Sequence, residues 1–449
     1  MVSLLAYFAI PIITPDVMDY LYREPLIQNQ EGNNLTISLF AEGLSFPTSM
    51  EFVDNNTILA LEKNGDVRLI SNGKIQKEPI LSVDVVNEAE RGLLGMAILK
   101  NNTNADNVNL TDNNTINFTS RNSESNPEYS NYSVFLYFTE KIKDEATNNY
   151  TIHNRIYEYS WINHQKLTHP RLVMDLPAEL GPYHNGGKLK IGPDKHLYAV
   201  IGDLITINNT LQNRPEESNR TAVPNNSSVI IRIDPSNVAP PKDNPFYKYY
   251  NNDSNLKSLS FYYAYGIRNS FGFDFDPLTA QLWDTENGED RYDEINIVEP
   301  GFNSGWYRIM GPLSQHNESD IITKLVIFNG SHYSDPIFSW FKPIGITDIE
   351  FFKSSKFGKE FENNVFVGDI NNGNLYFFKV NATRSGIDIC KFSDNKGSSL
   401  DDRVVDNKAE LERVVFANGF DGRITDIETG NDGYLYILTY FDGRIYRIS

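Results

Sequence analysis

Short stretches in which apolar and polar residues alternate recur along most of the chain, separated by glycine, asparagine, aspartate and proline. One stretch runs through Ile58–Leu61, turns at Asn64 and Gly65, and continues through Val67–Ile70. A period of two residues, bounded by turn-forming residues, is typical of β-strands. No strong helical period lies between the stretches. Similar units begin near Phe46, Gly92, Gly187, Asn269, Ile346 and Ile424.

Six units of three to four strands predict an all-β fold, a six-bladed β-propeller of four-stranded antiparallel blades. A closed ring also removes the exposed sheet edges that a strand-rich chain otherwise presents. The strand expected near Leu35–Phe40 would complete the last blade and close the ring. A pair of packed β-sandwiches is the alternative architecture.

One polar segment interrupts the strand pattern. Residues 101–132 are rich in Asn, Thr and Ser, and they separate two strands of the second unit. This composition predicts a surface insertion in blade two, because loops of a compact domain run over its surface. The propeller itself is expected to span residues 31–449.

Residues 1–30 are expected to form an N-terminal leader or anchor. The chain is apolar from Met1 to Ile13, which is shorter than the about 20 residues that a helix needs to cross a bilayer. The stretch is similar to the apolar part of a secretory signal, although no Lys or Arg precedes it. We therefore expect an extracytoplasmic protein, either secreted or tethered to the outer face of the cell membrane.

Charge and cysteine content narrow the possible partners. The net charge of −19 repels a phosphate backbone, so we expect no nucleic-acid partner. The single cysteine, Cys390, excludes an intrachain disulfide and a cysteine-based metal site.

A histidine and an aspartate stand at the ends of two neighbouring predicted strands. His184 lies just before one strand, and Asp203 lies just after the next. Antiparallel pairing brings both positions to one end of the sheet, where the side chains can meet. A neutral imidazole held by a carboxylate is a competent general base near neutral pH. The alternative is that His184 is a hydrogen-bonded loop residue.

Seven short phrases follow one another along the chain. They are Gly43–Pro47, Glu62–Arg68, Glu90–Gly95, His184–Leu189, Tyr265–Asn269, Asp293–Asn296 and Asn303–Trp306. In this order they resemble the soluble quinoprotein glucose/sorbosone dehydrogenases, the aldose sugar dehydrogenases. The resemblance covers the chain from about residue 36 to its end.

The resemblance implies that pyrroloquinoline quinone (PQQ) lies over the central channel and accepts a hydride from C1 of an aldose, which becomes a lactone. His184 matches the base that takes the C1 hydroxyl proton, and Asp203 matches the carboxylate that orients this base. Arg268 and Asn269 match an Arg-Asn pair at the quinone, where an arginine stabilises developing negative charge. A structural arginine is the alternative for Arg268. The implied partners are a small-molecule sugar substrate and an external electron acceptor.

The resemblance also implies two calcium (Ca2+) ions. Gly288 and Glu289 fall where backbone carbonyls hold the calcium that polarises the quinone, although the family usually has Gly-Pro there. Hard cations prefer such oxygen ligands. Glu294 and the carbonyl of Ser304 match a second, structural calcium position. A surface or capping carboxylate is the alternative for Glu294.

Several positions around the implied cofactor depart from the family pattern. The family carries Arg-x-Arg-Asp in its final blade, whereas this chain has Arg423 and then Thr425. Asn371 stands where a lysine is frequent, and Glu90 stands where a glutamine is common. Because PQQ carries three carboxylates, these changes are expected to weaken its binding by roughly a few kcal/mol. Lys342 is the candidate for a compensating cation, with a solvated surface lysine as the alternative.

Two functions from other classes stay open. One is a non-catalytic, calcium-stabilised binding propeller without a quinone, which Thr425 and Asn371 favour. The other is a metal-dependent propeller lactonase or hydrolase that uses a calcium-bound water. That reaction would require an acidic cluster, for which Glu90, Glu286 and Asp203 are the candidates.

Overall fold

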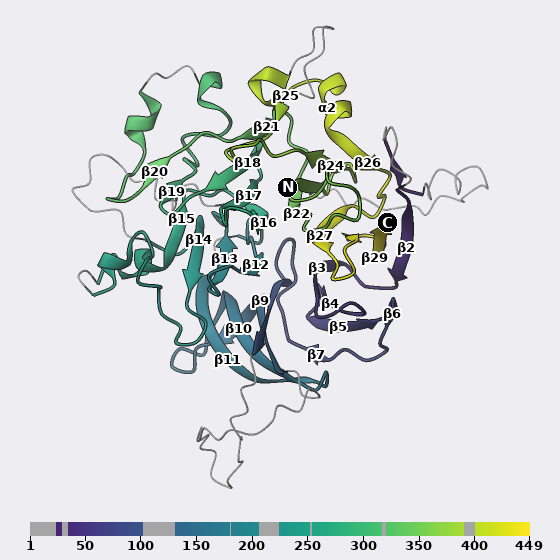
Figure 1. Cartoon of the computed structure of the whole chain (residues 1–449). Helices are drawn as coiled ribbons and strands as arrows, with labels where there is room; N and C mark the ends of the chain where they lie inside the picture. Colours follow the sequence, from purple (N-terminus) through teal and green to yellow (C-terminus); the bar gives the residue numbers. More distant parts are fainter. Residues whose placement is uncertain are drawn as a thin grey trace, which may run out of the picture.

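The computed structural model describes residues 24–28, 35–101, 131–179, 181–205, 224–251, 254–316, 320–389 and 400–449. Their strands form six sheets that follow one another around a ring (Figure 1). The innermost strand of each sheet contacts the innermost strand of the next sheet. The exception is the third sheet, where β13 (Leu197–Ile201), the second strand, contacts β16 (Ser270–Phe275) of the next sheet. The ring is therefore continuous. The predicted all-β propeller is therefore confirmed.

The first three sheets in chain order carry the N-terminal half of the ring. One contains β3 (Pro47–Phe52), β4 (Thr57–Glu62), β5 (Asp66–Ser71), β6 (Lys74–Ile75) and β7 (Leu81–Ser82). The next contains β8 (Leu93–Asn101), β9 (Asn131–Lys143), β10 (Tyr150–Ile162) and β11 (Leu167–Pro177). The third contains β12 (Leu189–Ile191), β13 (Leu197–Ile201), β14 (Val229–Ile233), β15 (Tyr262–Tyr265), β19 (Phe302–Asn303) and β20 (His332–Tyr333).

The other three sheets combine C-terminal strands with short pieces of the N-terminus. One contains β16 (Ser270–Phe275), β17 (Leu282–Glu286), β18 (Asp293–Val298), β21 (Phe338–Trp340) and β25 (Val404–Val405). The next contains β22 (Ile346–Phe351), β23 (Val365–Asp369), β24 (Leu375–Phe378), β26 (Val415–Asn418) and β1 (Leu26–Ile27). The last contains β27 (Ile424–Thr429), β28 (Leu435–Thr439), β29 (Arg444–Ile448) and β2 (Ile37–Glu42).

The sheets contain four to six strands, so the prediction of uniformly four-stranded blades is wrong in detail. Loops account for the difference, because short strands within them return along the outer edge of a sheet. Thus β19 and β20 extend the sheet of β15 in parallel, and β25 extends the sheet of β21. Such additions satisfy backbone groups that an edge strand would otherwise leave open.

The ring closes through the N-terminal strand, as predicted. β2 pairs antiparallel with β29, with Ile37 opposite Ile448. β1 pairs with β26 although it lies inside the segment expected to be a leader. The rest of that leader up to residue 23 lies outside the described residues, as do Cys390 and nearly all of the insertion at 101–132. The two strands that flank the insertion pair directly, with Asn101 opposite Asn131.

Apolar side chains fill the space between neighbouring sheets. Trp340 is fully buried there and packs edge-on against Tyr376 at a ring-centroid distance of 5.3 Å. Helical structure is confined to short connections, and no helix in the described ranges is long and apolar enough to cross a membrane. The described helices are η3 (Tyr247–Tyr249), η4 (Lys257–Phe261), η5 (Leu313–Gln315), η6 (Ile321–Lys324), η8 (Leu400–Asp402) and α2 (Lys408–Val414).

Candidate active site

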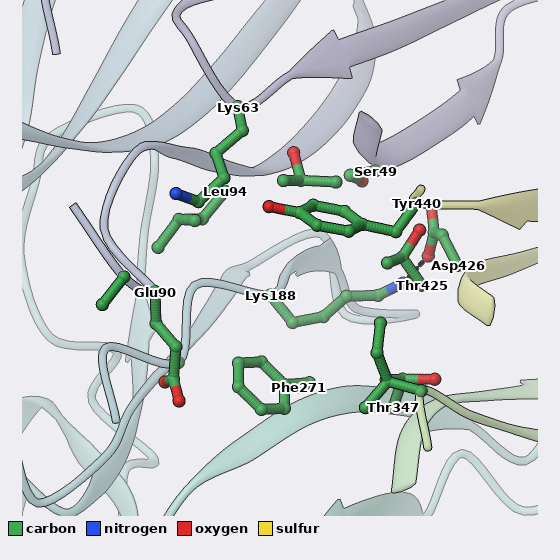
Figure 2. A pocket seen from close by; sticks show the side chains of 14 residues that line it. Ser49, Lys63, Glu90, Leu94, Lys188, Phe271, Thr347, Thr425, Asp426 and Tyr440 are labelled. Atoms are coloured by element: carbon green, nitrogen blue, oxygen red, sulfur yellow. Dashed lines mark hydrogen bonds and ion pairs between the residues drawn. The ribbon is translucent and has the colours of Figure 1, made fainter. Parts of the chain in front are cut away.

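Five of the six innermost strands carry a β-bulge near the end where they begin. The register shifts fall at Thr48 in β3, Leu94 in β8, Phe271 in β16, Thr347 in β22 and Thr425 in β27. A bulge leaves an extra residue outside the ladder and re-aims its side chain. All five residues line the same cavity at this end of the ring (Figure 2). The bulges thus create the site from otherwise regular strands.

The cavity encloses about 290 Å³, close to the lower limit of roughly 300 Å³ for small-molecule sites. Leu94, Phe271, Ile370 and Tyr440 give it apolar and aromatic walls. Hydroxyl groups and four charged side chains add polar contacts. The polar lining residues are Thr48, Ser49, Lys63, Glu90, Lys188, Thr347, Thr425 and Asp426.

Lys188 and Asp426 form a buried ion pair in the wall of the cavity. The Lys188 Nζ atom lies 2.7 Å from Asp426 Oδ1 and 2.9 Å from Asp348 Oδ1, and its side chain is only 6% exposed. Burial lowers the pKa of Lys188, but Asp348 and Asp426 oppose burial and raise the pKa above its ordinary value. The lysine therefore stays charged, and its charge is already balanced by the protein.

A second charged layer lies two residues further along the same strands. Lys190 Nζ contacts Asp274 Oδ1 at 2.9 Å and Glu350 Oε2 at 3.2 Å. Lys190 lies in β12, and Lys188 directly precedes this strand. Residues two apart on a strand face the same side, so both lysines point into the channel. Glu51 and Glu428 interact electrostatically with these lysines. The channel below the cavity is therefore polar and rich in buried charge.

His184 and Asp203 are in contact, as predicted. The distance from His184 Nδ1 to Asp203 Oδ1 is 2.6 Å, and the Asp203 side chain is only 1% exposed. Ile205 donates its backbone N–H to the same carboxylate oxygen. A carboxylate at Nδ1 fixes the tautomer in which Nε2 carries the lone pair. This arrangement suits a general base.

Glu90 connects the histidine to the cavity. Its Oε2 atom accepts the backbone N–H of His184 at 2.6 Å and the side-chain amide of Asn269 at 3.4 Å. Glu90 also lines the cavity. Burial raises the pKa of Glu90, whereas the neighbouring His184 and these hydrogen bonds lower it. Glu90 is therefore a structural acceptor for the loop that carries His184.

Arg268 is buried beside the His184–Asp203 pair. Its Nη1 atom donates to the carbonyl of Asn287 at 2.9 Å, and its guanidinium lies 5.3 Å from the Trp306 ring centroid. The Nε atom of Arg268 and the Oδ1 atom of Asn269 are buried without a hydrogen-bond partner among the described residues. Within the described residues, the guanidinium of Arg268 and the side-chain amide of Asn269 therefore each keep one unsatisfied hydrogen-bonding atom.

Hydrogen bonds to Asp293 hold the loop after β17 in place. Gly288 donates its N–H to Asp293 Oδ1 at 2.9 Å, and Asp293 Oδ2 accepts three backbone N–H groups at the start of β22. A Cβ atom at Gly288 would lie 1.9 Å from the Arg291 carbonyl oxygen, so this position requires glycine. The side chain of Glu289 is exposed. A glutamate is therefore compatible with the fold at this position, where the family pattern has a proline.

Glu294 and Ser304 both lie beside a second acidic residue, Glu286. Glu294 is paired directly opposite Glu286 across β17 and β18, and the Ser304 hydroxyl donates to Glu286 Oε2 at 2.5 Å. Burial raises the pKa of Glu286 to about 7. In the part of the chain that the structure describes, no group of three or more His, Cys, Asp and Glu side chains is placed to hold a metal ion. A site here would need the backbone carbonyl of Ser304 as well.

The remaining predicted cofactor residues are dispersed. Thr425 lines the cavity, and its hydroxyl donates to the carbonyl of Pro47 at 3.2 Å. Asn371 is exposed on the loop next to the lining residue Ile370. Arg423 is half-buried and Lys342 is exposed, and neither lines the cavity.

Sequence reasoning missed two cavity lysines. Lys63 and Lys188 lie inside phrases that carried the family resemblance, but neither was singled out. The repeated sequence Ile-Thr-Asp-Ile-Glu at 346–350 and 424–428 was a usable signal, because it places two aspartates at equivalent inner positions. Two acidic residues facing a channel require a buried cation, and Lys188 supplies it.

The fold and the site define a class of protein: a propeller with a small-molecule cavity at one end of its channel and a histidine–carboxylate pair beside it. The chain matches the Glucose / Sorbosone dehydrogenase family over residues 44–447 and belongs to this family. It is 23% identical to the aldose sugar dehydrogenase YliI of Escherichia coli over 449 residues, which cover 99% of this chain and 98% of the relative. It is 30% identical to quinoprotein glucose dehydrogenase B of Acinetobacter calcoaceticus over 149 residues, which cover 31% and 29% of the two chains.

Solved structures support the same fold. The apo-form of the soluble aldose sugar dehydrogenase from Escherichia coli superposes with a TM-score of 0.64 at 20% identity, covering 93% of this chain and 99% of the other. The PQQ-bound aldose sugar dehydrogenase from Streptomyces coelicolor gives a TM-score of 0.59 at 20% identity, covering 93% and 98%. The family is one of sugar-oxidising oxidoreductases.

Proposed function

We propose that this protein is a PQQ- and calcium-dependent dehydrogenase that oxidises the C1 hydroxyl of an aldose to a lactone. The observation that carries the proposal is the His184–Asp203 contact, with Nδ1 and Oδ1 2.6 Å apart, beside the cavity at the mouth of the channel. Family membership supports sugar oxidation as the reaction class.

In this reaction His184 removes the proton of the C1 hydroxyl at Nε2, because Asp203 holds Nδ1 protonated. The buried carboxylate also stabilises the imidazolium that forms. PQQ, when bound, supplies the acceptor for the C1 hydride. Arg268 would stabilise the negative charge that develops on the group that accepts the hydride, since a guanidinium in a buried site interacts strongly with an anion.

The cavity offers contacts for a flat ligand that carries a carboxylate. Phe271 and Tyr440 offer aromatic walls, Thr347 and Thr425 offer hydroxyls, and Lys63 offers a positive charge. The carbonyl oxygens of Gly288 and Glu289 are the proposed calcium ligands at the quinone, and Glu294 with the Ser304 carbonyl is the proposed structural calcium position. Electrons would then pass to an external acceptor.

A cofactor titration tests the proposal. The purified apo-protein is mixed with PQQ and calcium, bound-quinone absorbance is followed, and glucose is then added. We expect tight binding and reduction of the bound quinone, with reduction lost and binding kept in His184→Ala. No binding at micromolar PQQ in the presence of calcium would overturn the proposal.

A non-catalytic binding propeller is the second candidate. Thr425 and Asn371 replace two cations of the family pattern at positions on or next to the cavity wall. In this case calcium would stabilise the protein, but no quinone would bind.

We also propose an extracytoplasmic location and one blade for each of the six sheets. Cell fractionation tests the location.

A further inference from the structure

Four charged side chains line the cavity, and each of them contacts a protein group. Lys188 is paired with Asp426 at 2.7 Å. Asp426 also accepts the backbone N–H of Met50 at 2.6 Å. Glu90 accepts the backbone N–H of His184 at 2.6 Å. The fourth is Lys63, which faces the cavity from the turn between β4 and β5 (Figure 2).

Lys63 has a neutral partner instead of an anionic one. Its Nζ atom donates to the carbonyl of Asn87 at 2.5 Å, and within the described ranges it forms no ion pair at 4.0 Å or less. Burial lowers the pKa of Lys63, and the attraction of Glu90 opposes this shift. The protein thus partly desolvates a positive charge at the cavity wall without giving it a direct ion pair, so a carboxylate of a ligand can still pair with it.

The local backbone holds this lysine in place. Gly92, with φ of 144°, lies so close to Lys63 that a Cβ atom there would be 2.7 Å from Lys63 Cγ and 2.6 Å from its carbonyl oxygen. The absence of a side chain at Gly92 therefore lets the lysine stem lie along the start of β8. The ammonium group consequently has a defined place at the cavity wall.

We infer that Lys63 is the carboxylate-binding residue of this cavity and that it pairs with a carboxylate of the bound cofactor. This inference rests on the proposed function, because PQQ carries three carboxylates. It also accounts for the loss of cations at Asn371 and Thr425, since the chain supplies a positive charge from a different sheet. Lys342, by contrast, is exposed and does not line the cavity.

Equilibrium titrations with PQQ in the presence of calcium test the inference. Lys63→Met is expected to raise the Kd at least about tenfold, and Lys63→Arg is expected to stay near wild type, because the loss of one charge-assisted contact has this size. The Kd of Lys63→Met should also depend less on salt than the Kd of wild type. Lys77→Met, at an exposed lysine, is the matched control. Thermal melting confirms that each variant is folded.

Two further ligands separate the possible outcomes. A neutral ortho-quinone without carboxylates should bind wild type and Lys63→Met equally. If Lys63→Met binds PQQ as tightly as wild type, the inference is wrong while the dehydrogenase proposal stands. The inference is also wrong if the variant loses only kcat/KM for glucuronate relative to glucose, because Lys63 would then recognise an acidic sugar.

Failure of the proposed function would give a different pattern. If wild type does not bind PQQ, the dehydrogenase proposal falls, and the role of Lys63 toward carboxylates is decided with pyridine-2,4,6-tricarboxylate. Binding by wild type that is lost in Lys63→Met would support a carboxylate site for another ligand. No binding, or equal binding by both proteins, would overturn that role as well.

Discussion

The indole Nε1 of Trp306 donates to Oδ2 of Asp203 at 2.7 Å, although the two residues are 103 positions apart in the chain. The other oxygen of this carboxylate faces His184 Nδ1. Asp203 is therefore held from both sides in a buried position, and its orientation does not depend on solvent. The same tryptophan ring lies under the guanidinium of Arg268. One residue thus links the proposed base to the proposed electrostatic stabiliser.

Replacing Asp203 by Asn should leave the fold intact and disable the base. The amide can hold the imidazole in the wrong tautomer, with its proton on Nε2. We expect kcat for an aldose to fall by about 10³–10⁴, as in comparable histidine–aspartate pairs. Stopped-flow reduction of the bound quinone measures the chemical step, and PQQ affinity should change little. A variant with near-normal reduction rates would show that Asp203 does not orient the base.

Lys188→Met should destabilise the propeller strongly. The substitution leaves Asp348 and Asp426 buried without their shared cation. We expect a loss of about 3–5 kcal/mol in the free energy of unfolding, the usual result of breaking a buried ion pair from one side. Urea denaturation at pH 7 measures it. The exposed Lys74→Met serves as control and should change stability by less than about 0.5 kcal/mol. Equal stability of the two variants would contradict a central role for the buried pair.

If the backbone of residues 288–289 binds calcium, substitutions at these two positions should have different effects on calcium affinity. Gly288→Ala should lower calcium affinity, because a methyl group 1.9 Å from the Arg291 carbonyl forces the loop to move. Glu289→Ala should leave calcium affinity within about twofold of wild type, since backbone carbonyls do not depend on the identity of an exposed side chain. Isothermal titration with calcium in the presence of PQQ compares them. Calcium binding that depends on the Glu289 carboxylate would show a different ligand set.

The sequence predicted the features that depend on local pattern and neighbouring strands. Alternation and turn residues predicted the propeller and its closing strand, and β2 does pair with β29. The His184–Asp203 contact was predictable because both residues lie at the ends of adjacent antiparallel strands, β12 and β13.

The rest depended on contacts between sheets. The β-bulges that aim Thr347 and Thr425 into the cavity follow from how the inner strands pack around the ring, and alternation alone does not reveal them. Trp306 and Lys63 reach the site from loops of other sheets. Position in the sequence suggested Lys342 as the compensating cation, whereas the geometry favours Lys63. Short motifs locate a site, but long-range packing decides which charges face it.

The buried charge in the channel predicts a dependence of stability on pH. Burial raises the pKa of Glu51 from 4.5 to about 7, while Lys190 and Lys188 act in the opposite direction. Because the folded state binds this proton more tightly than the unfolded chain, the stabilisation is complete below about pH 4.5 and is lost as the pH rises toward 7.

Glu51→Gln retains a neutral side chain at every pH. Its stability relative to wild type should therefore increase between pH 4.5 and 7, by roughly 1–2 kcal/mol for a half-buried group. Urea denaturation at several pH values tests this, with the exposed Glu78→Gln as control. A constant difference across the range would show that Glu51 does not titrate as described.

Restoring an arginine at Thr425 should strengthen cofactor binding. Thr425 occupies a bulge of β27 and lines the cavity, so a longer cationic side chain at this position can reach a polyanionic ligand. We expect Thr425→Arg to lower the Kd for PQQ about tenfold, as one additional charge-assisted contact would. Thr425→Met adds length without charge and should not tighten binding. In Lys63→Met, Thr425→Arg should recover much of the lost affinity, because both cations act on the same anion. If Thr425→Arg and Thr425→Met bind PQQ alike, the cavity does not recognise the cofactor through its charge.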